Sequence, residues 1–170
     1  MNCHPFHYKD WLFMHNGVIR GFKLIKRDLH IRIDPELFSE IVGTTDSETF
    51  FYLALTFGLQ EDPPAALAKT VAYIDKVARA HGVKNPIQMT VCTTKGKGKL
   101  WAFRFSSEGK SRTLYYSTDV KKIVELYPER AIVRKFSDEA RIIVSEPLSS
   151  FPGMWNPVPE SSCVVVNGGS

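Results

Sequence analysis

The sequence predicts an α+β fold in which helices and antiparallel strands occupy separate parts of the chain. Helix-starting patterns are concentrated between residues 34 and 82, whereas β-rich segments dominate from residue 87 onward. An aromatic, β-prone segment precedes both. This grouping is typical of a layered α+β domain and not of an alternating parallel sheet. A chain of 170 residues can bury a substantial core, so we expect residues 1–170 to form one domain.

Local signals predict three helices in the first half of the chain. Thr45 and Glu48 form a Thr-x-x-Glu capping box, and the apolar run 50–55 behind it predicts a helix buried between layers. Pro63 begins a second helix, whose apolar positions repeat at helical spacing until Gly82. Asp34-Pro35 predicts a short helix that extends through Val42.

Alternating and apolar β-prone runs predict the strands. Residues 11–14 form a buried strand that ends at the turn dipeptide Asn16-Gly17. Residues 87–93 and 100–105 form a hairpin around the glycine-rich turn 96–98. Further strands are expected at residues 113–117, 141–144 and 163–166, with a short helix at residues 120–127.

Composition excludes several classes of protein. The net charge of +4 and the pI near 9.0 are mildly basic, and no apolar run reaches the roughly 20 residues that span a membrane. No secretory signal begins the chain. Three widely spaced cysteines argue against a disulfide framework and for the cytoplasm; Cys92 and Cys163 are expected to be buried in the core. Their spacing fits no metal site, so we expect no metal.

Two short motifs carry the functional signal. One is the run Trp-Leu-Phe-Met-His-Asn-Gly at residues 11–17, which follows Asn-Cys-His-Pro-Phe at residues 2–6; the other is Gly-Thr-Thr-Asp-Ser-Glu at residues 43–48. Together they resemble the glutaminase domain of class II glutamine amidotransferases, which are N-terminal-nucleophile hydrolases. The small single-domain branch that includes γ-glutamyl hydrolases is the most similar. The resemblance implies a four-layer αββα sandwich, here N-terminally incomplete, that uses no cofactor.

The resemblance also implies roles for four residues. Asn16 and Gly17 match the oxyanion hole, in which fixed donors stabilise the tetrahedral intermediate of amide hydrolysis. Asp46 matches the carboxylate that binds the α-ammonium of glutamine. His15 belongs to the substrate site as a positioning or packing residue, because the family's general base is the free amine of the nucleophilic cysteine. From the residues alone, Asn16-Gly17 is equally a hairpin turn and Asp46 a helix-dipole partner.

The nucleophile of the family does not occur at its usual place. The family uses a cysteine directly after the initiator methionine, whereas position 2 here is Asn2, and Cys3 has no free amine. The arginine that holds the substrate carboxylate also has no counterpart. We therefore expect a chain that lacks the N-terminal part of the domain and is inactive alone, which leaves its enzymatic activity open. No synthase domain follows, which favours hydrolysis of glutamine or a γ-glutamyl compound over amide transfer.

Two alternative functions remain from the sequence. The chain could be a non-catalytic remnant that serves as an interaction module, and bare sheet surfaces would then favour a homo-oligomer. A basic nucleic-acid-binding module is the weaker alternative, and we expect no nucleic-acid or membrane partner. It depends on basic residues that surround Trp101 and Phe103, namely Lys95, Lys97, Lys99, Arg104, Lys110 and Arg112.

Overall fold

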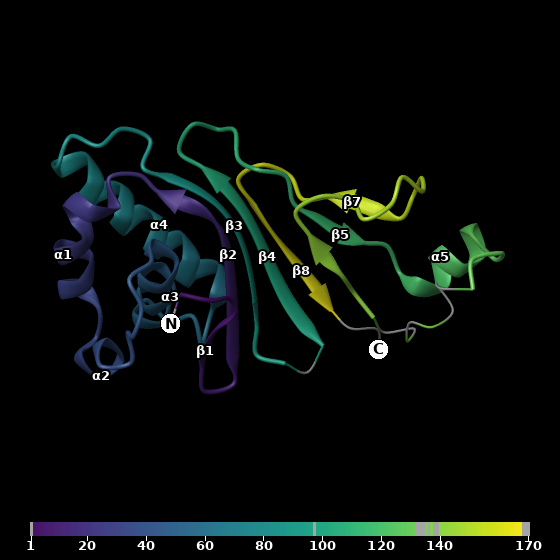
Figure 1. The fold of residues 1–170 in the computed structure, drawn as a ribbon, viewed down its shortest axis with the longest axis horizontal. Helices are drawn as coiled ribbons and strands as arrows, with labels where there is room; N and C mark the ends of the chain where they lie inside the picture. Colours follow the sequence, from purple (N-terminus) through teal and green to yellow (C-terminus); the bar gives the residue numbers. More distant parts are fainter. Residues whose placement is uncertain (1, 97, 132–134, 136, 138–139, 168–170) are drawn as a thin grey trace.

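The computed structural model contains two antiparallel sheets and describes residues 2–96, 98–131, 135, 137 and 140–167 (Figure 1). The larger sheet has five strands in the order β1-β2-β3-β4-β8, and the smaller has three in the order β6-β5-β7. The larger sheet comprises β1 (Phe6–Tyr8), β2 (Trp11–Ile19), β3 (Ile87–Thr94), β4 (Lys99–Ser106) and β8 (Ser162–Asn167). The smaller comprises β5 (Tyr115–Ser117), β6 (Ile143–Val144) and β7 (Trp155–Pro157).

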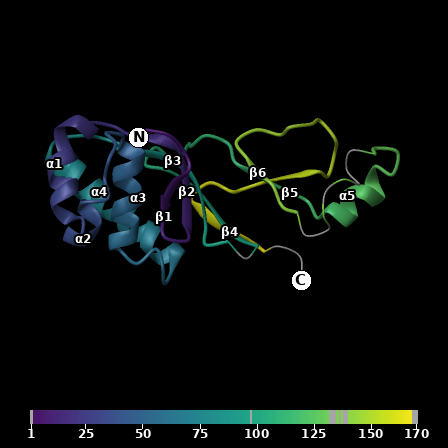
Figure 2. The ribbon, with the colours of Figure 1, turned by 60° about the horizontal axis from the view of Figure 1, so that its bottom comes forward.

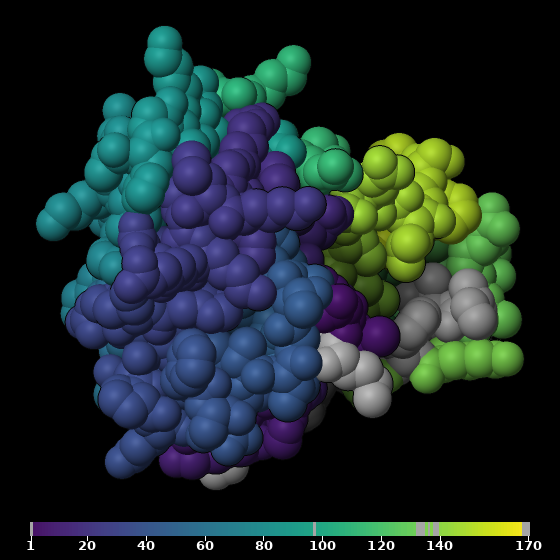
Figure 3. All heavy atoms as spheres, turned by 60° about the vertical axis from the view of Figure 1, so that its left-hand side comes forward, coloured from purple at the N-terminus to yellow at the C-terminus, as the bar shows by residue number. Residues whose placement is uncertain are grey.

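Helices cover one face of the larger sheet, as Figures 1 and 2 show. They are α1 (Phe22–Arg32), α2 (Pro35–Phe38), α3 (Asp46–Thr56) and α4 (Pro63–Ala80). Phe13 of β2 stacks against Phe50 and Phe51 of α3, and all three are fully buried. The space-filling view in Figure 3 looks onto this helical side of the molecule, where segments of the first half of the chain form most of the surface. The main core therefore lies between α3, α4 and the sheet.

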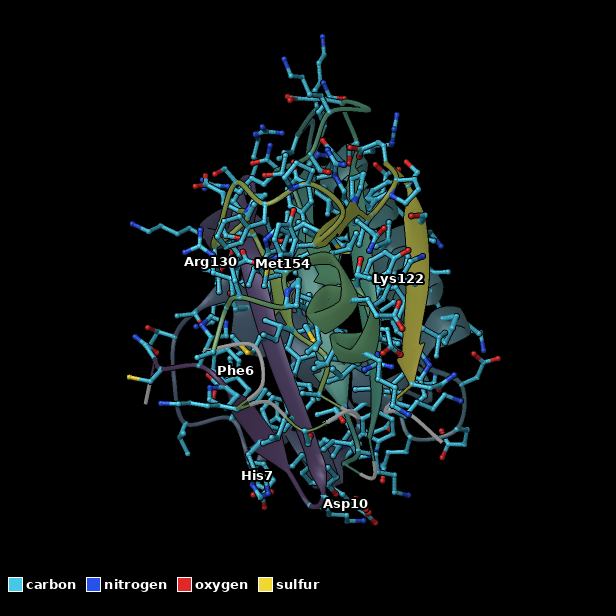
Figure 4. The ribbon with its side chains drawn as sticks, turned by 90° about the vertical axis from the view of Figure 1, so that its right-hand side faces the viewer. Phe6, His7, Asp10, Lys122, Arg130 and Met154 are labelled. Atoms are coloured by element: carbon cyan, nitrogen blue, oxygen red, sulfur yellow. The ribbon has the colours of Figure 1, made fainter. Side chains whose placement is uncertain are left out.

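The smaller sheet packs against the other face of the larger sheet, but only over β4 and β8. Ala102 of β4 and Val164 of β8 contact Leu114, Ile143 and Val158 in a second, small core. The short helix α5 (Val120–Leu126) lies beyond the smaller sheet (Figure 1). Figure 4 views the molecule from this side, with β8 at one margin and the labelled Phe6 and His7 of β1 toward the other.

The α+β class and its antiparallel sheets are confirmed, and so are the hairpin, the helix after Thr45 and the helix that begins at Pro63. The four-layer sandwich and its N-terminal incompleteness stay predictions. The sequence did not predict helix α1. This helix follows Gly21, has no side-chain cap and buries only Ile25 and Leu29, so its local sequence signal is weak. Lys97, part of the predicted hairpin turn, lies outside the described residues.

Three local predictions are wrong. Strand β2 does not end at Asn16-Gly17 but continues to Ile19, because residues 12–19 pair without interruption with β3. The helix after Pro35 ends at Phe38 and not at Val42. Cys163 is exposed because β8 is an edge strand, whereas Cys92 is half-buried.

Candidate active site

Strand β2 divides the predicted site residues between the two faces of the sheet. Side chains alternate along a strand, so His15 points with Phe13 and Ile19 toward the helices and is buried. Asn16 points to the opposite face and is exposed. No hydrogen bond to the Asn16 carboxamide is found among the described residues. The side chain of Asn16 is therefore available to a ligand, whereas that of His15 is enclosed.

The backbone of β2 also has two different edges. On one edge, the carbonyls of Leu12 and Asn16 accept hydrogen bonds from the hydroxyls of Thr93 and Thr90 of β3. Backbone groups two residues apart share an edge, so the even-numbered residues of β2 face β3. The odd-numbered residues face the other edge, where β1 pairs only with Trp11–Phe13. The N–H groups of Gly17 and Ile19 thus lie beyond the end of β1.

Asp46 reaches that second edge from the first turn of α3. Its Oδ2 accepts a hydrogen bond of 2.7 Å from the Ile19 N–H, and its Oδ1 accepts one of 2.9 Å from the Ser47 N–H. Each carboxylate oxygen retains capacity for another donor. The position also favours a negative charge at the positive end of the helix dipole. Both interpretations of Asp46 from the sequence, ammonium binding and helix stabilisation, are geometrically compatible.

His15 is enclosed by α3 on one side and β3 on the other. Its Nδ1 lies 2.8 Å from the hydroxyl of Ser47 in α3, and the Gln88 carbonyl oxygen and His15 Nε2 both border the space beside Gly17. Phe50 stacks on the ring with centroids 5.5 Å apart. Burial lowers the pKa of His15 from 6.5 to about 4, while the nearby Asp46 opposes this effect. The imidazole is therefore neutral near pH 7 and has no open face toward a substrate.

Gly17 has no space for a side chain. A Cβ atom at this position would lie 2.0 Å from the Gln88 carbonyl oxygen and 2.5 Å from His15 Nε2. The glycine is required by close packing against β3 and the imidazole, and not by a turn. The Asn-Gly dipeptide was expected to form a turn. Gly17 instead lies inside a regular strand, where close packing excludes any larger residue.

Comparison with known proteins assigns this geometry to a family. No protein-family profile matches the chain. A probable glutamine amidotransferase of Saccharomyces cerevisiae, DUG3, is 30% identical over 186 residues, which cover 97% of this chain and 52% of that protein. The solved structure of a glutamine aminotransferase class-II domain protein from Silicibacter pomeroyi is 31% identical, with a TM-score of 0.81. That match covers 98% of this chain and 67% of the other.

This chain belongs to the class II glutamine amidotransferase family. It spans about half the length of the curated relative that it matches. The hydrogen bond between Asp46 and the Ile19 N–H joins the start of α3 to β2, the strand that contains Asn16 and Gly17.

Sequence reasoning missed some residues that shape the candidate site. Ser47 was only part of a motif, yet it contacts His15. Asn2 accepts a hydrogen bond from the Thr44 N–H and donates one to its hydroxyl. These partners are 42 residues apart, and no local sequence signal announces such a pair. The capping box is half present, since Thr45 accepts from the Glu48 N–H.

Glu48 forms its own contacts at the start of α3. Its buried carboxylate accepts hydrogen bonds from the N–H groups of Val42 and Gly43, and not from the capping residue. It therefore holds the loop that leads to Asp46. Glu48 therefore has a structural role, but its partners lie two to three residues before Thr45, the partner that a capping box predicts.

A cavity between α4 and the larger sheet does not overlap this site. It has a volume of about 690 Å³ and lies between α4 and strands β4 and β8, with Leu67, Val71, Phe103 and Phe105 among its lining residues. Asn16, which is exposed, and the half-buried Gly17 and Asp46 do not line it. No helix of the described residues is long and apolar enough to cross a membrane, and none of their side-chain clusters has the composition of a metal site.

The aromatic residues that suggested nucleic-acid binding by the basic hairpin pack within the fold. Phe103 is buried, and Trp101 packs against Trp11 with centroids 5.6 Å apart. Arg104 donates to the Ser111 hydroxyl and the Val158 carbonyl and pairs with Glu160. Arg104 is thus engaged within the fold, and the buried Phe103 cannot serve as a stacking platform for a base.

Proposed function

We propose that the chain recognises the glutamine side chain in a domain that hydrolyses glutamine or a γ-glutamyl compound. The supporting observation is the hydrogen bond between Asp46 and the Ile19 N–H. It brings the carboxylate to the same edge of β2 as the Gly17 N–H. Two residues of a strand span about 7 Å, which sets the scale of the distance between the anionic group and the donor.

This spacing suits a glutamine lying along the strand edge. An extended glutamine has its ammonium nitrogen roughly 6 Å from its amide oxygen, from ordinary bond lengths. The ammonium would bind Asp46 by a charge-assisted hydrogen bond, and the amide oxygen would face the Gly17 N–H. The Asn16 carboxamide, exposed beside it, would supply the second donor to the oxyanion.

We assign no residue of this chain as the nucleophile that attacks the substrate amide. Burial raises the pKa of the half-buried Cys92 to about 11, so its thiol is a poor nucleophile near neutral pH. Cys163 is exposed on β8, three strands away from β2. Cys3 follows Asn2 and has no free amine to serve as its base. The 170-residue chain therefore binds and polarises a substrate but does not hydrolyse it alone.

Two measurements on the 170-residue chain test the proposal. No ammonia or glutamate should be released from L-glutamine or a γ-glutamyl amide. L-glutamine should nevertheless shift the NMR signals of the Gly17 N–H and the Asn16 side-chain amide. Asp46→Asn should abolish these shifts. Asp62→Asn is the matched control, because Asp62 also accepts a backbone N–H at a helix start but lies at α4.

Each part of the proposal can fail separately. Glutamine hydrolysis by the purified chain would refute the inactivity of these 170 residues. Shifts that persist in Asp46→Asn would refute the assignment of the ammonium site. Absence of any shift at Gly17 and Asn16 would refute the oxyanion assignment.

An exposed apolar surface favours the interaction module as a second candidate function. Leu12, Met14 and Val18 lie on the face of β2 that the smaller sheet leaves uncovered. They flank Asn16 on the same face, so a protein segment that covers them would also enclose the candidate site. We infer that this face is an interface.

A further inference from the structure

The hydrogen bond between His15 and Ser47 connects the strand that carries the oxyanion donors to the helix that carries Asp46. We infer that His15 and Ser47 are positioning residues, which hold Gly17 at a set distance from Asp46 without touching the substrate. This inference rests on the proposed function, because it assumes that Gly17 and Asp46 bind two ends of one ligand. The motifs alone placed His15 as a positioning or packing residue without saying what it positions, and they gave Ser47 no role.

The connection has two attachments, one on each side of Gly17. Two residues before it, the His15 ring meets the hydroxyl of Ser47. Two residues after it, the Ile19 N–H donates to Asp46. The attachment points on α3 are adjacent residues, so α3 cannot slide along β2 without breaking one of the two bonds. Gly17 is thereby held between two fixed points.

The surroundings of the His15 ring favour one tautomer. Nε2 and the Gln88 carbonyl oxygen, which can only accept, border the same space beside Gly17. We infer that Nε2 carries the proton, so that Nδ1 accepts from the Ser47 hydroxyl across 2.8 Å. The ionisable groups that influence the ring are Asp46 and His4. A neutral imidazole of this tautomer satisfies both partners, whose bonds lie in the main core.

Close packing transmits the position of the ring to Gly17. The space beside the Gly17 Cα is filled by His15 Nε2 and the Gln88 carbonyl oxygen, with no room even for a methyl group. A shift of the ring therefore moves the backbone of Gly17 or leaves an unsatisfied polar atom in the core. We therefore expect loss of the Ser47 hydroxyl to make the position of the Gly17 N–H less well defined, while the donor itself remains.

The chain contains a matched control for this bond. Thr49 of α3 is also buried, and its hydroxyl lies 2.9 Å from Nε2 of His30 in α1. Ser47→Ala and Thr49→Val each remove one hydroxyl that contacts a histidine from the same helix. Only Ser47→Ala affects the attachment to β2. His15→Asn is a conservative variant, because its Oδ1 can take the place of Nδ1 as acceptor for Ser47.

The test compares the binding of two ligands to the 170-residue chain. L-glutamine probes ground-state binding, and the phosphonate analogue of glutamate presents tetrahedral anionic oxygens to the oxyanion donors. We expect Ser47→Ala to weaken phosphonate binding about tenfold relative to glutamine binding. Thr49→Val should leave this ratio unchanged, and His15→Asn should partly restore it relative to His15→Ala. A general loss of stability would lower both affinities in proportion.

The failures of the two proposals are distinguishable. If the wild-type chain binds both ligands and Ser47→Ala has the wild-type ratio, the positioning role is refuted. If the wild-type chain binds neither ligand, the proposed function fails, and ring-nitrogen NMR then decides about the bridge itself. A wild-type His15 that is protonated on Nδ1, or a Gly17 amide signal that moves equally in Ser47→Ala and Thr49→Val, would refute it.

Discussion

His15 shows how burial decides the chemistry of a single residue. A histidine in a glutaminase-like motif invites a role in proton transfer, but this one is enclosed between Phe50, Ser47 and Gln88. Desolvation disfavours its charged form, so it is a neutral hydrogen-bonding element of the core. Its contribution to the site is mechanical, whereas the exposed Asn16 beside it can contact a ligand.

The low pKa of His15 makes stability depend on pH. The folded-state pKa of about 4 lies below the unfolded value of 6.5, so protonation favours the unfolded chain. The stability is fully present above pH 6.5 and is lost as the pH falls toward 4. Since one pKa unit corresponds to about 1.4 kcal/mol, we expect a loss of about 3 kcal/mol over this range.

Urea unfolding of wild type and His15→Asn at several pH values measures this loss. Wild type should be more stable near pH 7, and the difference between the two proteins should shrink as the pH falls through this range. A difference that stays constant down to pH 4 would contradict the assignment, because acidic side chains titrate in both proteins alike.

Gly17 provides a second test at the residue scale. Gly17→Ala should destabilise the chain by about 1–3 kcal/mol, because its Cβ would lie 2.0 Å from the Gln88 carbonyl oxygen. Gly82→Ala is the control, since Gly82 has a φ of +74° but no atom within 4 Å of a new Cβ. It should cost about 1 kcal/mol from backbone strain alone. Equal losses in thermal or urea unfolding would show that contact with β3 is unimportant.

At the scale of elements, the start of α3 is the main organiser of the site. The cap of Thr45, the carboxylate of Asp46 and the hydroxyl of Ser47 lie in consecutive residues, and each has a different partner. Glu48 then holds the preceding loop through the N–H groups of Val42 and Gly43. The first turn of α3 thus binds the preceding loop and strand β2, and it also caps its own helix.

Removal of the Glu48 carboxylate tests this organising role. Glu48→Ala should cost about 1–3 kcal/mol, because the N–H groups of Val42 and Gly43 lose their acceptor in a partly buried loop. Glu36→Ala, an exposed glutamate in the first turn of α2, should change stability little. The free energies of unfolding from urea titrations decide this, and similar values for the two variants would contradict the role of Glu48.

At the scale of the whole molecule, the two faces of the larger sheet are covered unequally. Helices cover one face over β1 to β4, and the smaller sheet covers the other face over β4 and β8 (Figures 1 and 2). The side of β2 that faces away from the helices therefore exposes an apolar strip, in which Met14 is 53% accessible. Exposed apolar sheet surfaces favour association.

We expect the 170-residue chain to self-associate through this strip, as light scattering after size-exclusion chromatography can measure. Met14→Lys should shift the distribution toward monomer. Ile31→Lys is the control, because Ile31 is 71% accessible but lies on α1, on the helical side. A wild-type chain that is monomeric at high concentration, or equal effects of the two variants, would contradict this interface.

Local patterns were sufficient where the energetics are local. The cap of α3, the proline that begins α4 and the β3–β4 hairpin depend on neighbours a few residues away, and each was found from the sequence. Helix α1 was not, because packing of Ile25 and Leu29 stabilises it rather than a cap. The Asn-Gly turn failed because pairing along the whole of β3 outweighs the preference of a dipeptide.

Local patterns were enough to predict the α+β class and to single out the motifs that contain Asn16, Gly17 and Asp46. The connection between these motifs depends on the tertiary fold, since the hydrogen bonds between β2 and α3 join residues 27 and 32 positions apart. The register of β2 against β3 and the packing of α3 set these bonds, and neither is encoded in a short window. Long-range pairing therefore places Asn16-Gly17 inside a regular strand and His15 in a buried hydrogen bond between β2 and α3.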